Sequence, residues 1–98
     1  MGLVISPKIK EKLRHKHWVN EEEIVQCFAS REGRFLIDTR EEHRTDPPTH
    51  WFIAETSRGR LLKVVFVPIG DEIHIKTAYT PNETEKRIYN KYGLGLKE

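Results

Sequence analysis

Apolar residues near the N-terminus recur at the spacing of two amphipathic helices. Ser6-Pro7 suits a helix start, because serine caps free backbone N–H groups and proline loses nothing at the first helical position. Asn20 and the acidic residues after it suit a second start, since carboxylates complement the positive end of the helix dipole. We therefore predict one helix that ends near residues 17–18 and another that begins after Asn20. Their buried positions would be Ile9, Leu13, Ile24, Cys27 and Phe28.

From residue 35 onward the pattern changes to short apolar or alternating runs that are separated by turn residues. Such runs predict strands, here at residues 35–37, 50–56, 61–67 and 73–79. The connections between the last three are short, so these strands should be antiparallel neighbours. The Thr80-Pro81-Asn82-Glu83 segment then reads as a capping box that starts a last helix at Thr80.

The order of these elements predicts an α+β fold: two helices, a four-stranded, mainly antiparallel sheet and a C-terminal helix. One domain would span residues 1–93, and residues 94–98 after Gly93 would form a flexible tail. Pairing the strands through their short loops sorts the side chains onto two faces. The predicted core face holds Trp51, Ile53, Leu62, Val64, Phe66, Ile73, Ile75 and Tyr79. The other face holds His50, Phe52, Ala54, Leu61, Lys63, Val65, His74, Lys76 and Ala78.

The second face carries the candidate chemistry. Lys63, His74 and Lys76 would project from adjacent strands next to His50, although lysine is uncommon in central strands. Converging cations can hold a phosphate, and a histidine among them can transfer a proton near neutral pH. The alternative is the polar, open face of a sheet that is covered by helices on one side only.

Composition narrows the functional classes. The net charge of +2, from 17 basic and 15 acidic residues, does not indicate nucleic-acid binding by itself, although basic residues cluster between Lys8 and Lys16. The single cysteine, Cys27, is predicted to be a core residue rather than a nucleophile. The five histidines lack metal-site spacing, so we expect no metal and no other cofactor. No signal peptide or membrane-spanning apolar run is visible, so we expect a cytoplasmic protein without membrane contact.

Two segments carry a resemblance to a known family. They are Thr56-Ser57-Arg58-Gly59-Arg60-Leu61-Leu62-Lys63-Val64-Val65 and Asp71-Glu72-Ile73-His74-Ile75-Lys76-Thr77-Ala78, followed by a capped helix and Tyr89. With Lys16-His17 and the acidic run at residues 21–23, they resemble the BrnT family of small toxins, which have a RelE-like fold. In that family an arginine often stands where this chain has Tyr79.

The resemblance implies an endoribonuclease of a type II toxin–antitoxin system that acts on RNA or the ribosome and is inhibited by a co-encoded DNA-binding antitoxin. On this reading His74 is the expected acid and base, and Lys63, Lys76 and Tyr79 complete the expected catalytic set. The expected RNA-binding residues are Arg58, Arg60, His50 and Tyr89. The alternative is a non-catalytic protein-interaction module of the same fold, which would bind a partner across the open sheet face.

The chain also resembles small uncharacterised proteins that are often described as ADP-ribosyl-(dinitrogen reductase) hydrolases. ADP-ribosylglycohydrolases are much larger, all-helical proteins whose clustered aspartates bind two metal ions. This chain of 98 residues has no such cluster, so we do not expect that activity.

Overall fold

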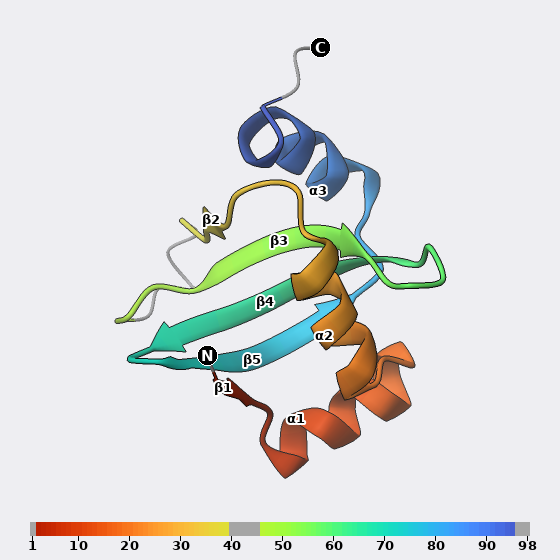
Figure 1. Cartoon of the computed structure of the whole chain (residues 1–98), viewed down its shortest axis with the longest axis vertical. Coiled ribbons are helices and arrows are strands. Elements are labelled where there is room, and N and C mark those ends of the chain that lie inside the picture. The colour runs from red at the N-terminus through yellow and green to blue at the C-terminus, as the bar shows by residue number, and fades with distance from the viewer. Residues whose placement is uncertain (1, 40–45, 96–98) are drawn as a thin grey trace.

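The computed structural model describes residues 2–39 and 46–95 of the chain, and these residues form an α+β fold (Figure 1). The helices are α1 (Pro7–Lys12), α2 (Glu21–Ser30) and α3 (Glu83–Ile88), and the π-helical segments η1 (Leu13–His17) and η3 (Tyr89–Gly93) continue α1 and α3. The strands are β1 (Gly2–Val4), β2 (Leu36–Ile37), β3 (His50–Glu55), β4 (Leu61–Ile69) and β5 (Glu72–Tyr79). The predicted tail is described only to Gly95, and its last residues lie outside the described part of the chain.

The sheet has five strands in the order β1-β5-β4-β3-β2. Strands β2 to β5 pair antiparallel, as expected, but β1 adds to the edge of β5 in parallel. The prediction of four antiparallel strands is therefore wrong in strand count. The strand β1 was missed because three residues are too few to show an alternating pattern. It is defined instead by its pairing with β5, beside which the Gly2 N–H donates to the Asp71 carbonyl at 3.1 Å.

Both predicted starts of the N-terminal helices are confirmed. The Ser6 hydroxyl accepts the Ile9 N–H at 3.3 Å, and Asn20 forms a capping box with Glu23. The first helix ends at Trp18, which has φ 56° and ψ 41°, in the left-handed region. This residue reverses the chain and allows α2 to begin at once.

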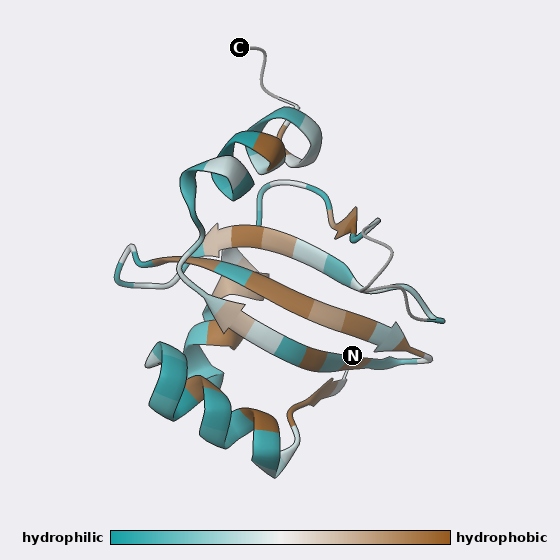
Figure 2. Ribbon diagram, turned by 180° about the vertical axis from the view of Figure 1, so that it is seen from behind, coloured by the Kyte–Doolittle hydropathy of each residue, from teal (hydrophilic) through white to brown (hydrophobic). Residues whose placement is uncertain are grey.

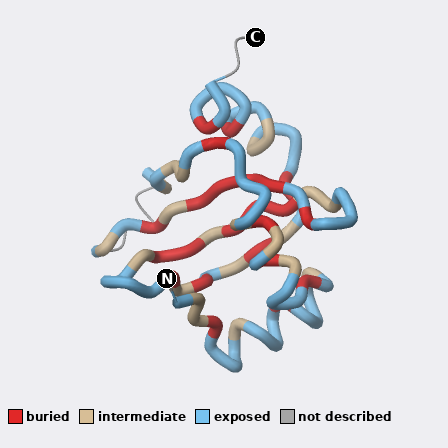
Figure 3. Tube along the Cα trace, in the orientation of Figure 1, coloured by how far each residue is buried: buried red, intermediate tan, exposed pale blue. Residues whose placement is uncertain are grey.

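The helices lie on different sides of the sheet. Figure 1 shows α2 in front of the sheet and α1 below it, while α3 lies beyond the β3 edge. From behind, no helix of the described chain crosses the central strands (Figure 2). Burial is concentrated in β3 and β4, with further buried residues in β5, α2, η1 and η3 (Figure 3). Cys27 belongs to this core, as predicted: its thiol donates to the Ala54 carbonyl at 3.6 Å, and burial raises its pKa to about 11.

The register of β3 differs from the prediction by one residue. Ile53 pairs with Lys63, and Ala54 pairs with Leu62, because the turn closes with the Thr56 N–H on the Arg60 carbonyl. The side chains of β3 are therefore exchanged between faces. The helix-covered face holds Phe52, Ala54, Leu62, Val64, Phe66, Ile75 and Ala78, and the opposite face holds Trp51, Ile53, Lys63 and Val65.

A β-bulge in β5 changes the second half of that strand. Val65 pairs with Thr77 while Phe66 pairs with Ile75, so Lys76 is the extra residue. The bulge turns Ala78 into the core and Tyr79 to the opposite face, where Tyr79 pairs with Lys63. The predicted assignment of Tyr79 to the core face is thus wrong, and the local cause is this one inserted residue.

The last helix begins two residues later than predicted. Asn82, not Thr80, is its N-cap: the Asn82 side chain accepts the Glu85 N–H at 2.8 Å, and the Glu85 carboxylate accepts the Asn82 N–H at 2.9 Å. Thr80 and Pro81 form the extended approach to this cap.

We expect Asn82→Ala to lower the free energy of unfolding by about 1 kcal/mol, because it removes the cap hydrogen bond. Thr80→Ala is the matched control and should change stability by less than about 0.5 kcal/mol. Urea unfolding followed by circular dichroism measures both. A larger effect at Thr80 than at Asn82 would contradict this start of α3.

Within the described residues, no helix combines the length and the apolar character that crossing a bilayer requires.

Candidate functional site

A buried ion pair joins the centre of the sheet to the first turn of α3. Lys63 projects from β4, and its Nζ donates to Glu85 Oε2 at 2.6 Å. The two side chains are only 7% and 16% exposed. Lysine and glutamate are rarely buried this far unless they are paired, so each buried charge is stabilised by the other.

The Glu85 carboxylate also connects the pair to Tyr79 and to the helix cap. Its Oε2 accepts the Tyr79 hydroxyl at 2.7 Å, and its Oε1 accepts the Asn82 N–H at 2.9 Å. Burial raises the pKa of Glu85, but the hydrogen bonds from Lys63, Asn82 and Tyr79 outweigh this and hold it below the ordinary value. Glu85 is therefore ionised at neutral pH.

Aromatic rings surround the ammonium group of Lys63. Its Nζ lies 4.5 Å from the centre of the Trp51 ring and 5.7 Å from that of Tyr79. The negative faces of these rings attract the cation and fix its position. The result is a preorganised cluster of one cation, one carboxylate and one phenol, which we call the Lys63 cluster (Lys63, Tyr79 and Glu85).

A groove of about 760 Å³ opens beside the Lys63 cluster. Lys63, Glu85 and Trp51 contribute to its lining, so the ion pair can be reached from the groove. The outer wall is apolar and comes from β2, α3 and η3: Ile37, Ile88 and Tyr92 are all exposed there. The groove therefore combines a charged floor with an apolar rim.

His17 extends the Lys63 cluster toward the first helix. Its ring centre lies 5.6 Å from that of Tyr79. Burial lowers the pKa of His17, and the positive charges of Lys16 and Lys12 lower it further. His17 is therefore a neutral imidazole at neutral pH, next to a phenol that donates to a carboxylate.

The structure does not bring the predicted face of Lys63, His74, Lys76 and His50 together. His74 pairs with Val67 near the start of β5, and its Nε2 lies 3.1 Å from Glu72 Oε1. It is five residues from Tyr79 along the strand, or about 16 Å. Lys76 is exposed at the bulge.

The other predicted positions have mainly structural surroundings. His50 lies against Phe66, with ring centres 5.7 Å apart, on the face opposite Lys63. Tyr89 is 1% exposed, and its hydroxyl donates to the Arg34 carbonyl at 2.9 Å, so its ring offers no open face to a base. Burial raises its pKa. Arg58 is exposed on the turn after β3.

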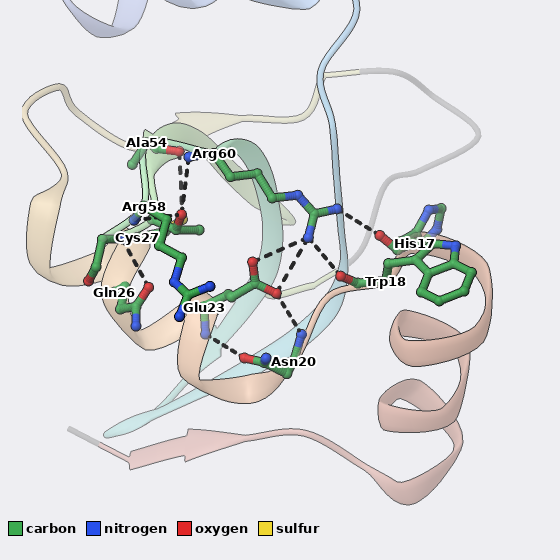
Figure 4. A network of polar contacts seen from close by, with 11 residues as sticks. His17, Trp18, Asn20, Glu23, Gln26, Cys27, Ala54, Arg58 and Arg60 are labelled. Carbon is green, nitrogen blue, oxygen red and sulfur yellow. Dashed lines mark hydrogen bonds and ion pairs between the residues drawn. The ribbon is translucent and has the colours of Figure 1, made fainter.

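Arg60 instead connects three elements in the network of Figure 4. Its guanidinium donates to the His17 carbonyl at 2.8 Å and to the Trp18 carbonyl at 2.7 Å. It also pairs with Glu23 of α2 at 3.2 Å. Arg60 therefore holds the turn between the first two helices.

Sequence reasoning did not single out Glu85 or His17 as site residues, although both contact the predicted residue Tyr79. A signal for Glu85 was present, since Asn82 and Glu85 have the spacing of a capping box. His17 could not be found this way, because only the tertiary fold brings η1 to the end of β5.

The Lys63 cluster holds a proton acceptor, a proton donor and a cation in direct contact. Glu85 is an ionised acceptor, Tyr79 is a donor, and Lys63 supplies fixed positive charge in a site partly shielded from water. In the part of the chain that the structure describes, no three His, Cys, Asp or Glu side chains are grouped so that they could hold a metal ion.

Comparison with known proteins adds no relative: no protein-family model matches this chain, and no curated protein matches it.

Proposed function

We propose that this protein is an RNA-directed toxin of the BrnT type, with a RelE-like fold, and that it acts as an endoribonuclease. The observation that supports this most is the Lys63 cluster, in which a cation and a carboxylate line an open groove and a phenol hydrogen-bonds to that carboxylate. Cleavage of RNA through its 2′-hydroxyl requires these three functions: a base, an acid and positive charge near the phosphate.

The proposed reaction follows from the contacts of each group. Glu85 accepts the proton of the 2′-hydroxyl, and the resulting oxygen attacks the neighbouring phosphorus. Lys63 stabilises the negative charge on the phosphoryl oxygens. Tyr79 protonates the departing 5′-oxygen, which leaves a 2′,3′-cyclic phosphate and a 5′-hydroxyl end. This assignment replaces His74 with Glu85, because the distance along β5 separates His74 from Lys63.

The toxin proposal includes a partner and a location. A cognate DNA-binding antitoxin would inhibit the protein, and both would act in the cytoplasm, where the RNA or ribosome is found. The exposed Ile37, Ile88 and Tyr92 at the rim support a protein contact over the groove, since an antitoxin that covered them would block Lys63 and Glu85.

The same apolar rim supports a second candidate function, a non-catalytic protein-interaction module. In that case the groove binds a partner, and the Lys63–Glu85 pair only anchors α3. The two functions differ in one observable property: a module does not cut RNA at any concentration.

We expect the purified protein to cut single-stranded RNA, and Tyr79→Phe to reduce the rate about 100-fold, because the proton donor is lost. Tyr92→Phe is the matched control: it removes the hydroxyl of a tyrosine that lines the groove and should retain full activity. Gel analysis of a labelled oligonucleotide measures the rate and identifies the cyclic phosphate.

Both variants should keep the far-UV circular dichroism spectrum of the parent. Full activity of a folded Tyr79→Phe variant would exclude Tyr79 as the acid. A parent protein that cuts no RNA, but binds a partner through the rim of the groove, would favour the interaction module.

A further inference from the structure

Trp18 is a large apolar side chain that the fold leaves in solvent. It is 80% exposed, whereas the second tryptophan, Trp51, is buried. Its backbone lies in the left-handed region at φ 56°, which glycine adopts easily and a bulky residue adopts only with strain. Glycine would suit the turn better, so folding does not explain tryptophan here, and such strain often marks functional positions.

The position of Trp18 is fixed by hydrogen bonds rather than by packing of its ring. Arg60 donates to the Trp18 and His17 carbonyls at 2.7 and 2.8 Å (Figure 4). The Val19 N–H closes the turn on the Leu13 carbonyl at 3.0 Å. The indole is thus presented to solvent from a rigid backbone, which lowers the entropy lost when a ligand stacks on it.

The helix that leads to Trp18 is basic: Lys10 pairs with Glu21 at 3.8 Å, but the basic residues closer to Trp18 have no such partner in the described chain. Lys12, Arg14 and Lys16 are all exposed, and none of them forms an ion pair within residues 2–39 and 46–95. Burial lowers the pKa of the nearby His17, and the positive charges of Lys16 and Lys12 lower it further. A rigid exposed aromatic ring beside unpaired cations is the arrangement that binds single-stranded nucleic acid.

We propose that Trp18 and the basic residues Lys12 and Lys16, which lie four residues apart on one face of the helix, form a binding site for single-stranded RNA. An unpaired base stacks on the indole, and the adjoining phosphates contact the two lysines. This inference rests on the proposed function, since RNA bound at Trp18 would extend toward the Lys63 cluster. Trp18 directly follows His17 in the chain, and the ring centre of His17 lies 5.6 Å from that of Tyr79.

We expect Trp18→Gly to weaken the affinity for a labelled 16-nucleotide oligouridine about tenfold or more, since a stacking partner is lost. The variant should fold at least as well as the parent because glycine relieves the strained turn. Trp18→Phe should recover much of the affinity. Ile69→Ala, which removes an exposed apolar side chain that does not line the groove, is the control and should bind like the parent. Fluorescence anisotropy of the labelled RNA measures all four proteins.

The salt dependence of the RNA affinity provides an independent test of the same site. Two phosphate contacts predict that affinity for single-stranded RNA falls about sevenfold between 50 and 200 mM salt. A duplex RNA of equal charge should bind more weakly, because its bases are already stacked. Affinity that does not change with salt, or with Trp18→Gly, would overturn the site. The site would also be overturned if the protein bound anionic phosphatidylserine vesicles more tightly than RNA and Trp18→Gly abolished that binding, because the basic helix and Trp18 would then form a membrane-binding surface.

Cleavage assays separate this inference from the proposed function. If the parent cuts RNA and Trp18→Gly cuts it with the same KM, the RNA site at Trp18 is refuted while the nuclease stands. If the parent binds oligouridine through Trp18 but releases no cyclic phosphate, the site is supported and the catalytic proposal fails.

Discussion

Replacing Lys63 with alanine should lower the free energy of unfolding by about 3–5 kcal/mol, because the substitution leaves the Glu85 carboxylate buried without its cation. A domain of this size has roughly 5–15 kcal/mol of stability in total, so we expect the variant to unfold at modest denaturant concentrations. The loss includes the contact of the ammonium group with the Trp51 ring. Urea unfolding at pH 7 measures the change.

The matched control removes both charges and keeps the shapes. In Lys63→Met combined with Glu85→Gln, methionine fills the space along β4, and glutamine still serves as the partner of Asn82 in the capping box. We expect this double variant to be far more stable than Lys63→Ala, since an unpaired buried charge is no longer present. If the double variant were the less stable protein, the ion pair itself would be the main source of stability.

The same pair predicts a pH dependence. The pKa of Glu85 is lower in the folded protein than in the unfolded chain, so its ionised form stabilises the fold above its unfolded pKa. That stability is lost as the pH falls through the folded pKa. The parent should therefore lose more stability in acid than the double variant, and urea unfolding at pH 7 and at pH 3 compares the two.

Replacing Arg60 with alanine should cost about 2–3 kcal/mol, because its guanidinium donates to two backbone carbonyls and pairs with Glu23. Water can replace part of this network, since the Arg60 side chain is partly exposed. Arg60→Lys should recover less than half of the loss, as one ammonium group cannot reproduce the planar fork of donors. Chemical unfolding monitored by circular dichroism measures the series.

Arg58 provides the control for Arg60. It lies on the same turn and is exposed, so Arg58→Ala should change stability by less than about 0.5 kcal/mol. A role for Arg60 in phosphate binding alone, as the sequence suggested, predicts equal stability for the two alanine variants. Unequal stabilities would show that Arg60 holds the Trp18 turn in place.

The sequence predicted most elements because their signals are local. Ser6 and Asn20 mark helix starts by their side-chain chemistry, and the alternating runs mark β3 to β5. Local sequence could not decide whether Thr80 or Asn82 is the N-cap of α3. Each is followed three residues later by a glutamate, but only Glu85 also meets Lys63 and Tyr79, and these tertiary contacts select the start of α3.

The candidate site was predicted only in part for a related reason. Lys63 and Tyr79 were both singled out, yet on opposite faces, because the bulge at Lys76 has no signal in a single sequence. A shift of one residue moves a side chain to the other face of a sheet, and this one bulge moves Tyr79 to the face of Lys63. His74 shares that face, as predicted, but it pairs with Val67 and therefore lies too far along β5 to meet Lys63.

The outer strands of the sheet have a consequence for association between copies of the protein. Strands β1 and β2 contain three and two residues, whereas the central β4 contains nine. Strand β1 pairs only with Glu72–His74 of β5, and β2 pairs only with His50 and Trp51 of β3, so in the described chain the rest of β5 and of β3 has no edge strand beside it. Unpaired strand edges are where a second chain can add, and loss of Gly2–Val4 would lengthen the unpaired edge of β5 by these three residues.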